Sequence, residues 1–199
     1  MFPILLDLAR ARVVVIGDGE AAVRRLAQLD ADGSGDLRVF SAAPSAALEL
    51  AAGARLVRRE PTMTDLAGTT IVFICDLGVT SSADIAGLAG RAGALVHVED
   101  QPRLCTIQMP AVVRRGDLTI AVSTNGVSPA LSRRLREHIA ALFGPEWAGR
   151  VALLGALRRS WRRAKVPAAE IARRTVAAVE SRGWLAGVGS GRDADRRRA

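Results

Sequence analysis

Two glycines follow an apolar run near the start of the chain, and helical spacing follows them. The run covers residues 12–16, and the glycines are Gly17 and Gly19. With Ala22 they form the pattern G-x-G-x-x-A, the dinucleotide-binding fingerprint of a strand–turn–helix unit. Such a turn brings backbone amides and the positive end of a helix dipole to a pyrophosphate. A glycine-rich turn without a ligand is the alternative, but the position on the first strand–helix unit favours a cofactor.

The predicted cofactor is NAD, held by the turn and by the end of the next strand. The residues of this predicted set are Gly17, Asp18, Gly19, Glu20, Ala21, Ala22, Ser41 and Ala42. Ser41 stands where the fingerprint usually carries an Asp or Glu for the adenosine ribose. A serine hydroxyl can also bond a ribose. The missing carboxylate therefore leaves NAD and NADP both open.

Strands and helices must alternate to position these residues. Apolar, β-branched runs predict strands at 12–16, 37–40, 54–57, 69–75 and 94–98. Helical spacing between them predicts helices at 20–31, 45–52 and 81–91. This alternation predicts an α/β fold with an open parallel sheet and helices on both of its faces. We expect this Rossmann domain to cover residues 1–99.

The pattern changes after residue 99. Two apolar runs at 105–113 and 117–123 have no helix between them, so they predict a hairpin, and Ser128-Pro129 begins a helix that ends near 143. This hairpin-and-helix region covers 100–144. Two more predicted helices, 146–165 and 167–182, make a small helical domain over 145–184. The Gly-, Asp- and Arg-rich segment 185–199 predicts a disordered tail.

Composition limits the class of protein. The chain has 199 residues, 49% of them hydrophobic, and a net charge of +8, which suggests an anionic partner. No recognised DNA-binding motif or aromatic platform accompanies the charge, so nucleic acid is not expected. Cys75 and Cys105 lack metal-type spacing and indicate a reduced compartment. Without a signal peptide or an apolar run of about 20 residues, we expect a cytoplasmic protein with no membrane span.

The segment 98–136 carries a distinctive set of motifs. It contains Val-Glu-Asp-Gln-Pro, Ile-Gln-Met-Pro-Ala-Val-Val-Arg-Arg-Gly and Ala-Val-Ser-Thr-Asn-Gly-Val-Ser-Pro-Ala. The opening Phe2-Pro3-Ile4 and the pair Arg24-Arg25 fit the same pattern. Over residues 2–145 the chain resembles the N-terminal module of siroheme synthases, the precorrin-2 dehydrogenase/sirohydrochlorin ferrochelatase family.

The resemblance implies a fold, a reaction and an assembly. The fold is a Rossmann domain, a central region that interlocks two subunits as a homodimer, and a helical C-terminal domain. The reaction is NAD-dependent oxidation of precorrin-2 to sirohydrochlorin, in some members followed by insertion of ferrous iron as a second substrate. No permanent metal site is expected, since His97 and His138 form no ligand pair. A dehydrogenase that leaves iron to another enzyme is the closest alternative.

Asp100 is the catalytic residue that the resemblance implies. The family's Asn-Val-Val-Asp segment matches His97-Val98-Glu99-Asp100 here, and its aspartate is the acid/base residue. A carboxylate at the carboxyl end of the last parallel strand lies beside the nicotinamide crevice, where it could accept a proton. The alternative is a loop aspartate that caps the turn before Pro102.

Three departures from the family pattern keep other interpretations open. His97 replaces an asparagine and could tune Asp100 or be a core histidine. The loop Ile74-Cys75-Asp76-Leu77 keeps one acid of two, Asp76, against the cofactor. The changes at His97 and Leu77 leave a non-catalytic NAD- or tetrapyrrole-binding regulatory module as the alternative function.

The third departure lies at the end of the hairpin. Asn125 replaces a family glycine, a mild change because Asn tolerates left-handed backbone angles. The neighbouring Ser123, Thr124 and Asn125 could bind substrate carboxylates, or they could be plain turn residues.

Overall fold

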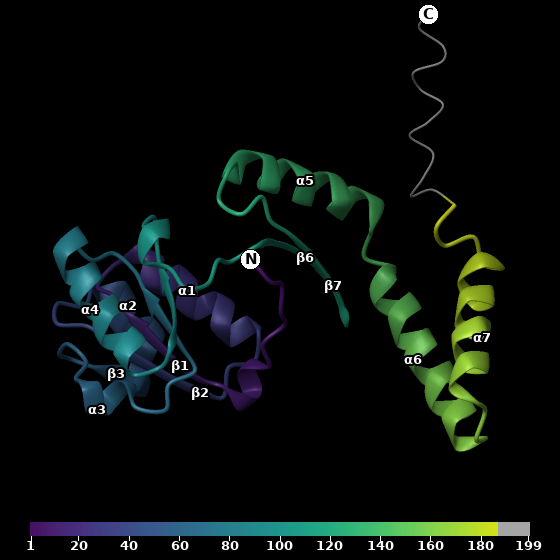
Figure 1. Ribbon diagram of the computed structural model, residues 1–199, viewed down its shortest axis with the longest axis horizontal. Coiled ribbons are helices and arrows are strands. Elements are labelled where there is room, and N and C mark those ends of the chain that lie inside the picture. Colours follow the sequence, from purple (N-terminus) through teal and green to yellow (C-terminus); the bar gives the residue numbers. More distant parts are fainter. Residues whose placement is uncertain (187–199) are drawn as a thin grey trace, which may run out of the picture. The chain divides into compact units, whose positions relative to one another are not determined.

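The computed structural model describes residues 1–186 (Figure 1). Two compact units make up the chain, the first covering Met1–Met109 and the second beginning at Pro110. Of the predicted tail, residues 187–199 lie outside the described part of the chain. Each unit has its own secondary structure and is described by itself.

A five-stranded parallel sheet forms the centre of the first unit. Its strands are β1 (Arg12–Ile16), β2 (Asp36–Phe40), β3 (Leu56–Val57), β4 (Ile71–Ile74) and β5 (Leu95–Val98). They lie in the order β3-β2-β1-β4-β5, and every neighbouring pair is parallel. All four residues of β4 are buried, as expected for a strand covered on both faces. The predicted Rossmann-type α/β fold is confirmed.

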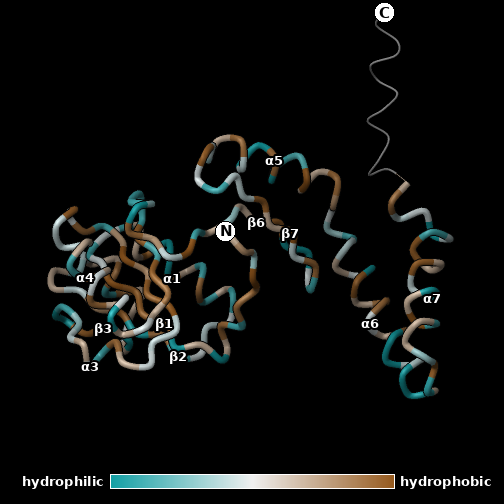
Figure 2. Tube along the Cα trace, viewed as in Figure 1, coloured by the Kyte–Doolittle hydropathy of each residue, from teal (hydrophilic) through white to brown (hydrophobic). Residues whose placement is uncertain are grey.

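Helices cover both faces of this sheet. They are α1 (Glu20–Ala31), α2 (Ala46–Ala52), α3 (Met63–Leu66) and α4 (Val79–Arg91), with short 3-10 helices at Leu8–Arg10, Gly53–Arg55 and Pro102–Leu104. On one face Leu26 of α1 and Leu48 of α2 pack against Val15. On the other face Ile85 of α4 packs among residues such as Ile16. Figure 2 shows the hydrophobic colour concentrated along the strands between these layers.

The stretch after β5 differs from the prediction of a strand at 105–113. The amides of Thr106 and Ile107 both donate to the carbonyl of Val96, at 2.9 and 3.2 Å. Thr106 Oγ1 also accepts from the Val96 amide at 2.8 Å. These bonds fasten the chain beside β5 without forming a ladder, and Pro110 then supplies no amide. The next strand begins only at Ala111, and the first unit continues past residue 99, where we predicted a domain boundary.

The second unit contains the predicted hairpin and three helices. Strands β6 (Ala111–Arg115) and β7 (Leu118–Val122) are antiparallel, and they are followed by α5 (Pro129–Leu142), α6 (Trp147–Arg163) and α7 (Ala168–Glu180). Ser128 caps α5, its hydroxyl accepting from the Leu131 amide at 3.3 Å. The hairpin and helices agree with the predicted elements. The division of this unit at residue 144 stays a prediction.

A charged cap at α3 makes the first unit sensitive to acid. Asp65 accepts from the Thr62 amide at 2.7 Å and from Arg59 through both of its oxygens, at 2.7 and 2.9 Å. The hydrogen bonds from Arg59, followed by those from Thr62, hold the pKa of Asp65 well below its usual range. A carboxyl with a depressed pKa stabilises the fold above its unfolded pKa of about 3.9, and this contribution is lost as the pH falls below that value.

We expect Asp65→Asn to lower the urea midpoint at pH 7 because the ion pair with Arg59 and the charged cap are lost. At pH 3 the difference in urea midpoint between variant and parent should be smaller, since protonation of Asp65 in the unfolded chain has already begun to lower the stability of the parent. Urea unfolding of both proteins at the two pH values measures this. An equal difference in urea midpoint at pH 7 and pH 3 would contradict the stabilising role assigned to the charge of Asp65.

Candidate functional site

The predicted phosphate turn has the geometry that its sequence requires. The Gly17 amide donates to the carbonyl of Phe40 at 3.1 Å, and α1 begins three residues later at Glu20. A Cβ on Gly17 would lie 2.2 Å from the carbonyl oxygen of Cys75. Only a residue without a side chain lets this turn pass so close to the end of β4. The turn therefore occurs in the strand–turn–helix context predicted for it.

Asp76, which we predicted to lie against the cofactor, is at the amino end of α1. Its φ is +56°, and its Oδ2 accepts from the Ala22 amide at 3.0 Å. A Cβ on Gly19 would lie 3.1 Å from the same oxygen. A carboxylate at this position is stabilised by the helix dipole. The structure thus brings Gly17, Gly19, Ala22 and Asp76 together around one helix terminus.

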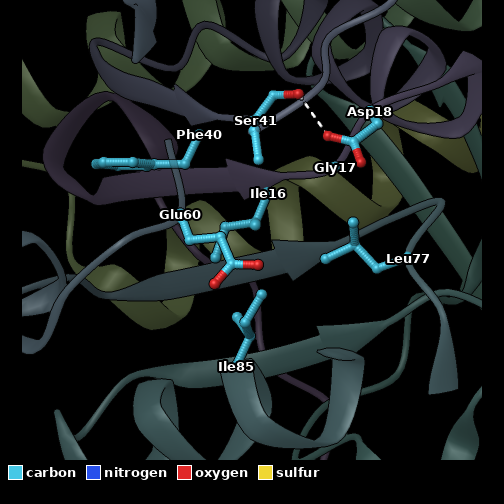
Figure 3. Close-up of a pocket in the computed structure, with 9 residues that line it drawn as sticks. Ile16, Gly17, Asp18, Phe40, Ser41, Glu60, Leu77 and Ile85 are labelled. Atoms are coloured by element: carbon cyan, nitrogen blue, oxygen red, sulfur yellow. Dashed lines mark hydrogen bonds between the residues drawn. The ribbon is translucent and has the colours of Figure 1, made fainter. Parts of the chain in front are cut away.

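A pocket opens beside this turn, at the carboxyl edge of the sheet (Figure 3). Its empty volume is about 240 Å³, including space open to solvent. The residues that line it are Ile16, Gly17, Asp18, Phe40, Ser41, Ala42, Glu60, Leu77 and Ile85. The Ser41 hydroxyl donates to Asp18 Oδ1 at 2.5 Å. Four predicted cofactor residues, Gly17, Asp18, Ser41 and Ala42, therefore share one cavity wall.

The pocket lies at the edge of the sheet where open α/β folds hold the adenosine end of a dinucleotide. Ile16, Leu77 and Ile85 supply apolar walls that suit a flat base, and the hydroxyl of Ser41 beside them is already bonded to Asp18. The helix terminus that would hold the pyrophosphate is adjacent, because Gly17 belongs to both. Ligands of open α/β sheets bind at this carboxyl edge.

Glu60 is a pocket residue that the sequence interpretation missed. It follows the two-residue strand β3 and lines the same cavity as Ser41. Figure 3 shows its carboxylate pointing toward Leu77 and Ile85. A carboxylate three residues after an apolar pair was the available signal, but so short a strand gives no reliable end point.

A partly buried polar cluster supports the end of β5. Arg25 Nη2 lies 3.5 Å from Glu99 Oε2, and the Cys75 thiol lies 3.8 Å from the same oxygen. The Arg25 guanidinium also stacks over the ring of Phe73, 4.8 Å from its centre. Burial, and then the charge of Glu99, raise the pKa of Cys75 to about 12, so this thiol is neutral. The cluster holds the residue directly before Asp100.

Asp100 lies at the carboxyl end of β5, exposed and with a φ of +58°. The Glu99 amide before it donates to the carbonyl of Ile74 at 2.9 Å, which fixes the end of the strand. The following 3-10 helix has Gln101 at its N-cap position and no side-chain cap. The predicted alternative, an Asp100 cap on the turn before Pro102, is thus not what this helix uses.

His97 is packed as a core residue. Its ring contacts Phe73 edge-on with centres 5.9 Å apart, and its Nδ1 lies 3.9 Å from Cys105 Sγ. Burial, followed by the charge of Arg25, lowers the pKa of His97, so the ring is neutral at pH 7. Of the two predicted roles, these contacts favour the satisfied histidine.

The segment Ser123–Asn125 lies in the second unit, between β7 and α5. Thr124 Oγ1 donates to the Ser128 carbonyl at 3.0 Å and lies 3.1 Å from Ser132 Oγ. Ser123 Oγ accepts from the Asn125 amide at 3.0 Å, and Asn125 has a φ of +50°. Asn125 thus adopts the left-handed conformation expected where the family has glycine. Substrate binding by these residues stays a prediction.

Within residues 1–186, no group of three or more His, Cys, Asp and Glu side chains is placed to hold a metal ion. In the same range, no helix combines the length and the apolar character that crossing a membrane requires.

Two family models match the chain. The first, described as putative NAD(P)-binding, covers residues 4–111, which includes the turn, the pocket and Asp100. The second, described as sirohaem biosynthesis protein central, covers residues 115–142. The predicted NAD cofactor agrees with the first match, and the motifs in the hairpin region agree with the second.

Curated relatives and a solved structure extend this result. The chain is 37% identical over 144 residues to a siroheme synthase of Pseudomonas putida, covering 70% of this chain and 30% of that one. It is 33% identical over 168 residues to a siroheme synthase of Methylococcus capsulatus, covering 83% and 35%. The chain thus spans about a third of the length of these relatives. The resemblance predicted from segment 98–136 is confirmed.

The solved structure is that of SirC, a precorrin-2 dehydrogenase. It aligns with a TM-score of 0.72 at 22% identity and covers 93% of this chain and 92% of its own. At this identity the likeness shows the shared fold.

Proposed function

The chain belongs to the family of putative NAD(P)-binding proteins, and we propose that it oxidises precorrin-2 to sirohydrochlorin with NAD. The observation that carries the proposal is the position of Asp100. This carboxylate lies at the carboxyl edge of the same sheet that carries the dinucleotide turn, in a chain similar to siroheme synthases. When bound, NAD supplies the acceptor for the hydride that the substrate loses.

Each part of the first unit has a role in this reaction. The amino end of α1 binds the pyrophosphate, since its amides and dipole attract an anion. The apolar side chains of Ile16, Leu77 and Ile85 pack on the flat faces of the adenine ring. The Asp100 carboxylate accepts the proton that leaves the substrate together with the hydride, so that charge and atoms balance. Arg25 and Glu99 keep the end of β5 in place for it.

The second unit supports a homodimer. Helix α5 carries an apolar stripe of Leu131, Leu135, Ile139 and Leu142, with the spacing of one helix face. No residue of this helix is buried, and Leu131 and Leu135 are 49% and 38% exposed. Helix α5 packs on the β6–β7 hairpin, yet its leucines stay partly exposed, so this apolar face is free to meet a covering surface. We propose that a second copy of the chain supplies it.

Leu135→Lys should weaken the homodimer by about tenfold or more, because a charge replaces an apolar side chain at the interface. Sedimentation over a range of concentrations measures the change in the dissociation constant. Arg134→Lys, on the exposed side of the same helix with its side chain 82% exposed, is the matched control. Equal dissociation constants for parent and Leu135→Lys would place the interface elsewhere.

The net charge supports the proposed substrate, and the free thiols support a cytoplasmic location. Precorrin-2 carries eight carboxylates, and the chain has a net charge of +8, which suits such a polyanion. Cys75 and Cys105 are both free, as in a reducing cytoplasm. No nucleic acid or membrane partner is proposed.

Anaerobic incubation of the purified protein with precorrin-2 and NAD tests the function, with sirohydrochlorin followed by its absorbance. We expect oxidation that depends on NAD. Ferrous iron is then added, and insertion faster than in a protein-free control would establish the second activity of the family. Binding of NAD without any oxidation would instead support the regulatory module.

A further inference from the structure

We propose that Glu60 supplies the carboxylate that binds the adenosine ribose and makes the chain select NAD over NADP. This inference rests on the proposed function, since it requires a bound dinucleotide. It assigns to a residue after β3 the role that such folds usually give to an acid at the end of β2.

The end of β2 has no acidic residue for this role. Ser41 follows the strand directly, with only 2% of its surface exposed. Its hydroxyl proton is already donated to Asp18 at 2.5 Å, and its amide donates to the carbonyl of Val57 at 3.1 Å. Ser41 therefore has no proton left for a ribose oxygen and no negative charge to offer.

The sheet order brings Glu60 to the position that β2 leaves without a carboxylate. Because β3 lies next to β2, the loop after β3 returns to the wall formed by Phe40 and Ser41. Glu60 lines the pocket together with these residues, and its carboxylate points across the cavity toward Leu77 and Ile85 (Figure 3). A carboxylate accepts hydrogen bonds from two adjacent ribose hydroxyls, and such charge-assisted bonds are strong.

The cations beside Glu60 are held by other acids. Arg58 Nη2 lies 2.9 Å from Glu49 Oε1. Arg59 binds both oxygens of Asp65 and stacks over the Phe40 ring, 5.5 Å from its centre. A site for NADP uses an arginine on the 2′-phosphate. Here the two nearest arginines along the chain, Arg58 and Arg59, are paired with other carboxylates. Within residues 1–186 the carboxylate of Glu60 has no such cation, so it repels a phosphate.

Asp18 is the rival for the same role. It also lines the pocket, and one of its oxygens accepts from Ser41 while the second stays available. The two carboxylates are distinguished by changing each to its amide, which keeps the shape and removes the charge.

The test measures binding of NADH and NADPH by their fluorescence, without substrate. We expect the parent to prefer NADH by about tenfold or more, and Glu60→Gln to reduce this preference by about tenfold, since one charge is lost from the site. Glu60→Arg should reverse the preference, because the new cation can bind a 2′-phosphate. Glu180→Gln, the same change on α7 in the second unit, should leave both affinities unchanged.

Three outcomes would overturn the proposal. An unchanged preference in Glu60→Gln excludes Glu60, and a preference that collapses only in Asp18→Asn assigns the role to Asp18. A parent that binds neither nucleotide removes the proposed function as well, so the two failures are distinguishable. Glu60 is exposed, and circular dichroism of its variants checks that the fold is intact.

Discussion

Asp100→Asn is expected to reduce kcat for precorrin-2 oxidation by about 10²–10⁴-fold, the usual contribution of a general base. The amide has the size of the carboxylate but cannot accept the proton that the substrate loses. Since Asp100 lies at the end of β5, away from the residues that line the adenosine pocket, the affinity for NAD should not change. Anaerobic turnover and NADH fluorescence measure the two quantities separately.

The choice of asparagine depends on the backbone. Asp100 has a φ of +58°, a conformation that Asn tolerates and that strains an alanine. Asp100→Ala therefore mixes a chemical loss with a structural one, although its turnover should also disappear. Asp84→Asn, an exposed aspartate on α4, repeats the substitution at a site without a role and should keep full activity. Activity retained by Asp100→Asn would show that this carboxylate does not handle the proton.

The first unit was predictable from sequence because burial on both faces leaves a strong pattern. Strands such as β1 and β4 consist mostly of aliphatic residues, and the turn at Gly17 follows one of them directly. The close approach of Gly17 to Cys75 explains why the glycine is there, but the contact joins residues that follow two different strands, β1 and β4. Sequence predicts the turn, and only the structure shows the carbonyl that it must avoid.

The missed residues depend on contacts between distant segments. Glu60 reaches the pocket because β3 lies outside β2, and strand order of this kind is not encoded in any local spacing. Glu99 and Arg25 meet across 74 positions of sequence, since α1 packs beside the end of β5. No local spacing distinguishes Glu99 from its neighbours in the sequence. Its partner gives it the role of holding the strand end.

Gly17→Ala is expected to destabilise the fold by about 3 kcal/mol or more, at the upper end of overpacking costs. The added Cβ would lie 2.2 Å from the carbonyl oxygen of Cys75 and 3.0 Å from its carbonyl carbon. Both atoms belong to the backbone at the end of β4, which cannot move aside without breaking its pairing with β1 and β5. Urea unfolding of the purified variant measures the change in the free energy of unfolding. If no folded protein can be recovered, the destabilisation exceeds the stability of the parent.

Two other glycines make this test specific. Gly90, inside α4, has no atom within 4 Å of an added Cβ, so Gly90→Ala should stabilise the fold by about 0.5–1 kcal/mol. Gly19→Ala brings its Cβ to 3.1 Å from Asp76 Oδ2, the end of a side chain that can shift. That variant should fold and bind NADH weakly, because the methyl group and the displaced carboxylate obstruct the pyrophosphate. If Gly17→Ala unfolded at the same urea concentration as Gly90→Ala, the turn would have space for a Cβ. The predicted clash with the Cys75 carbonyl would then be wrong.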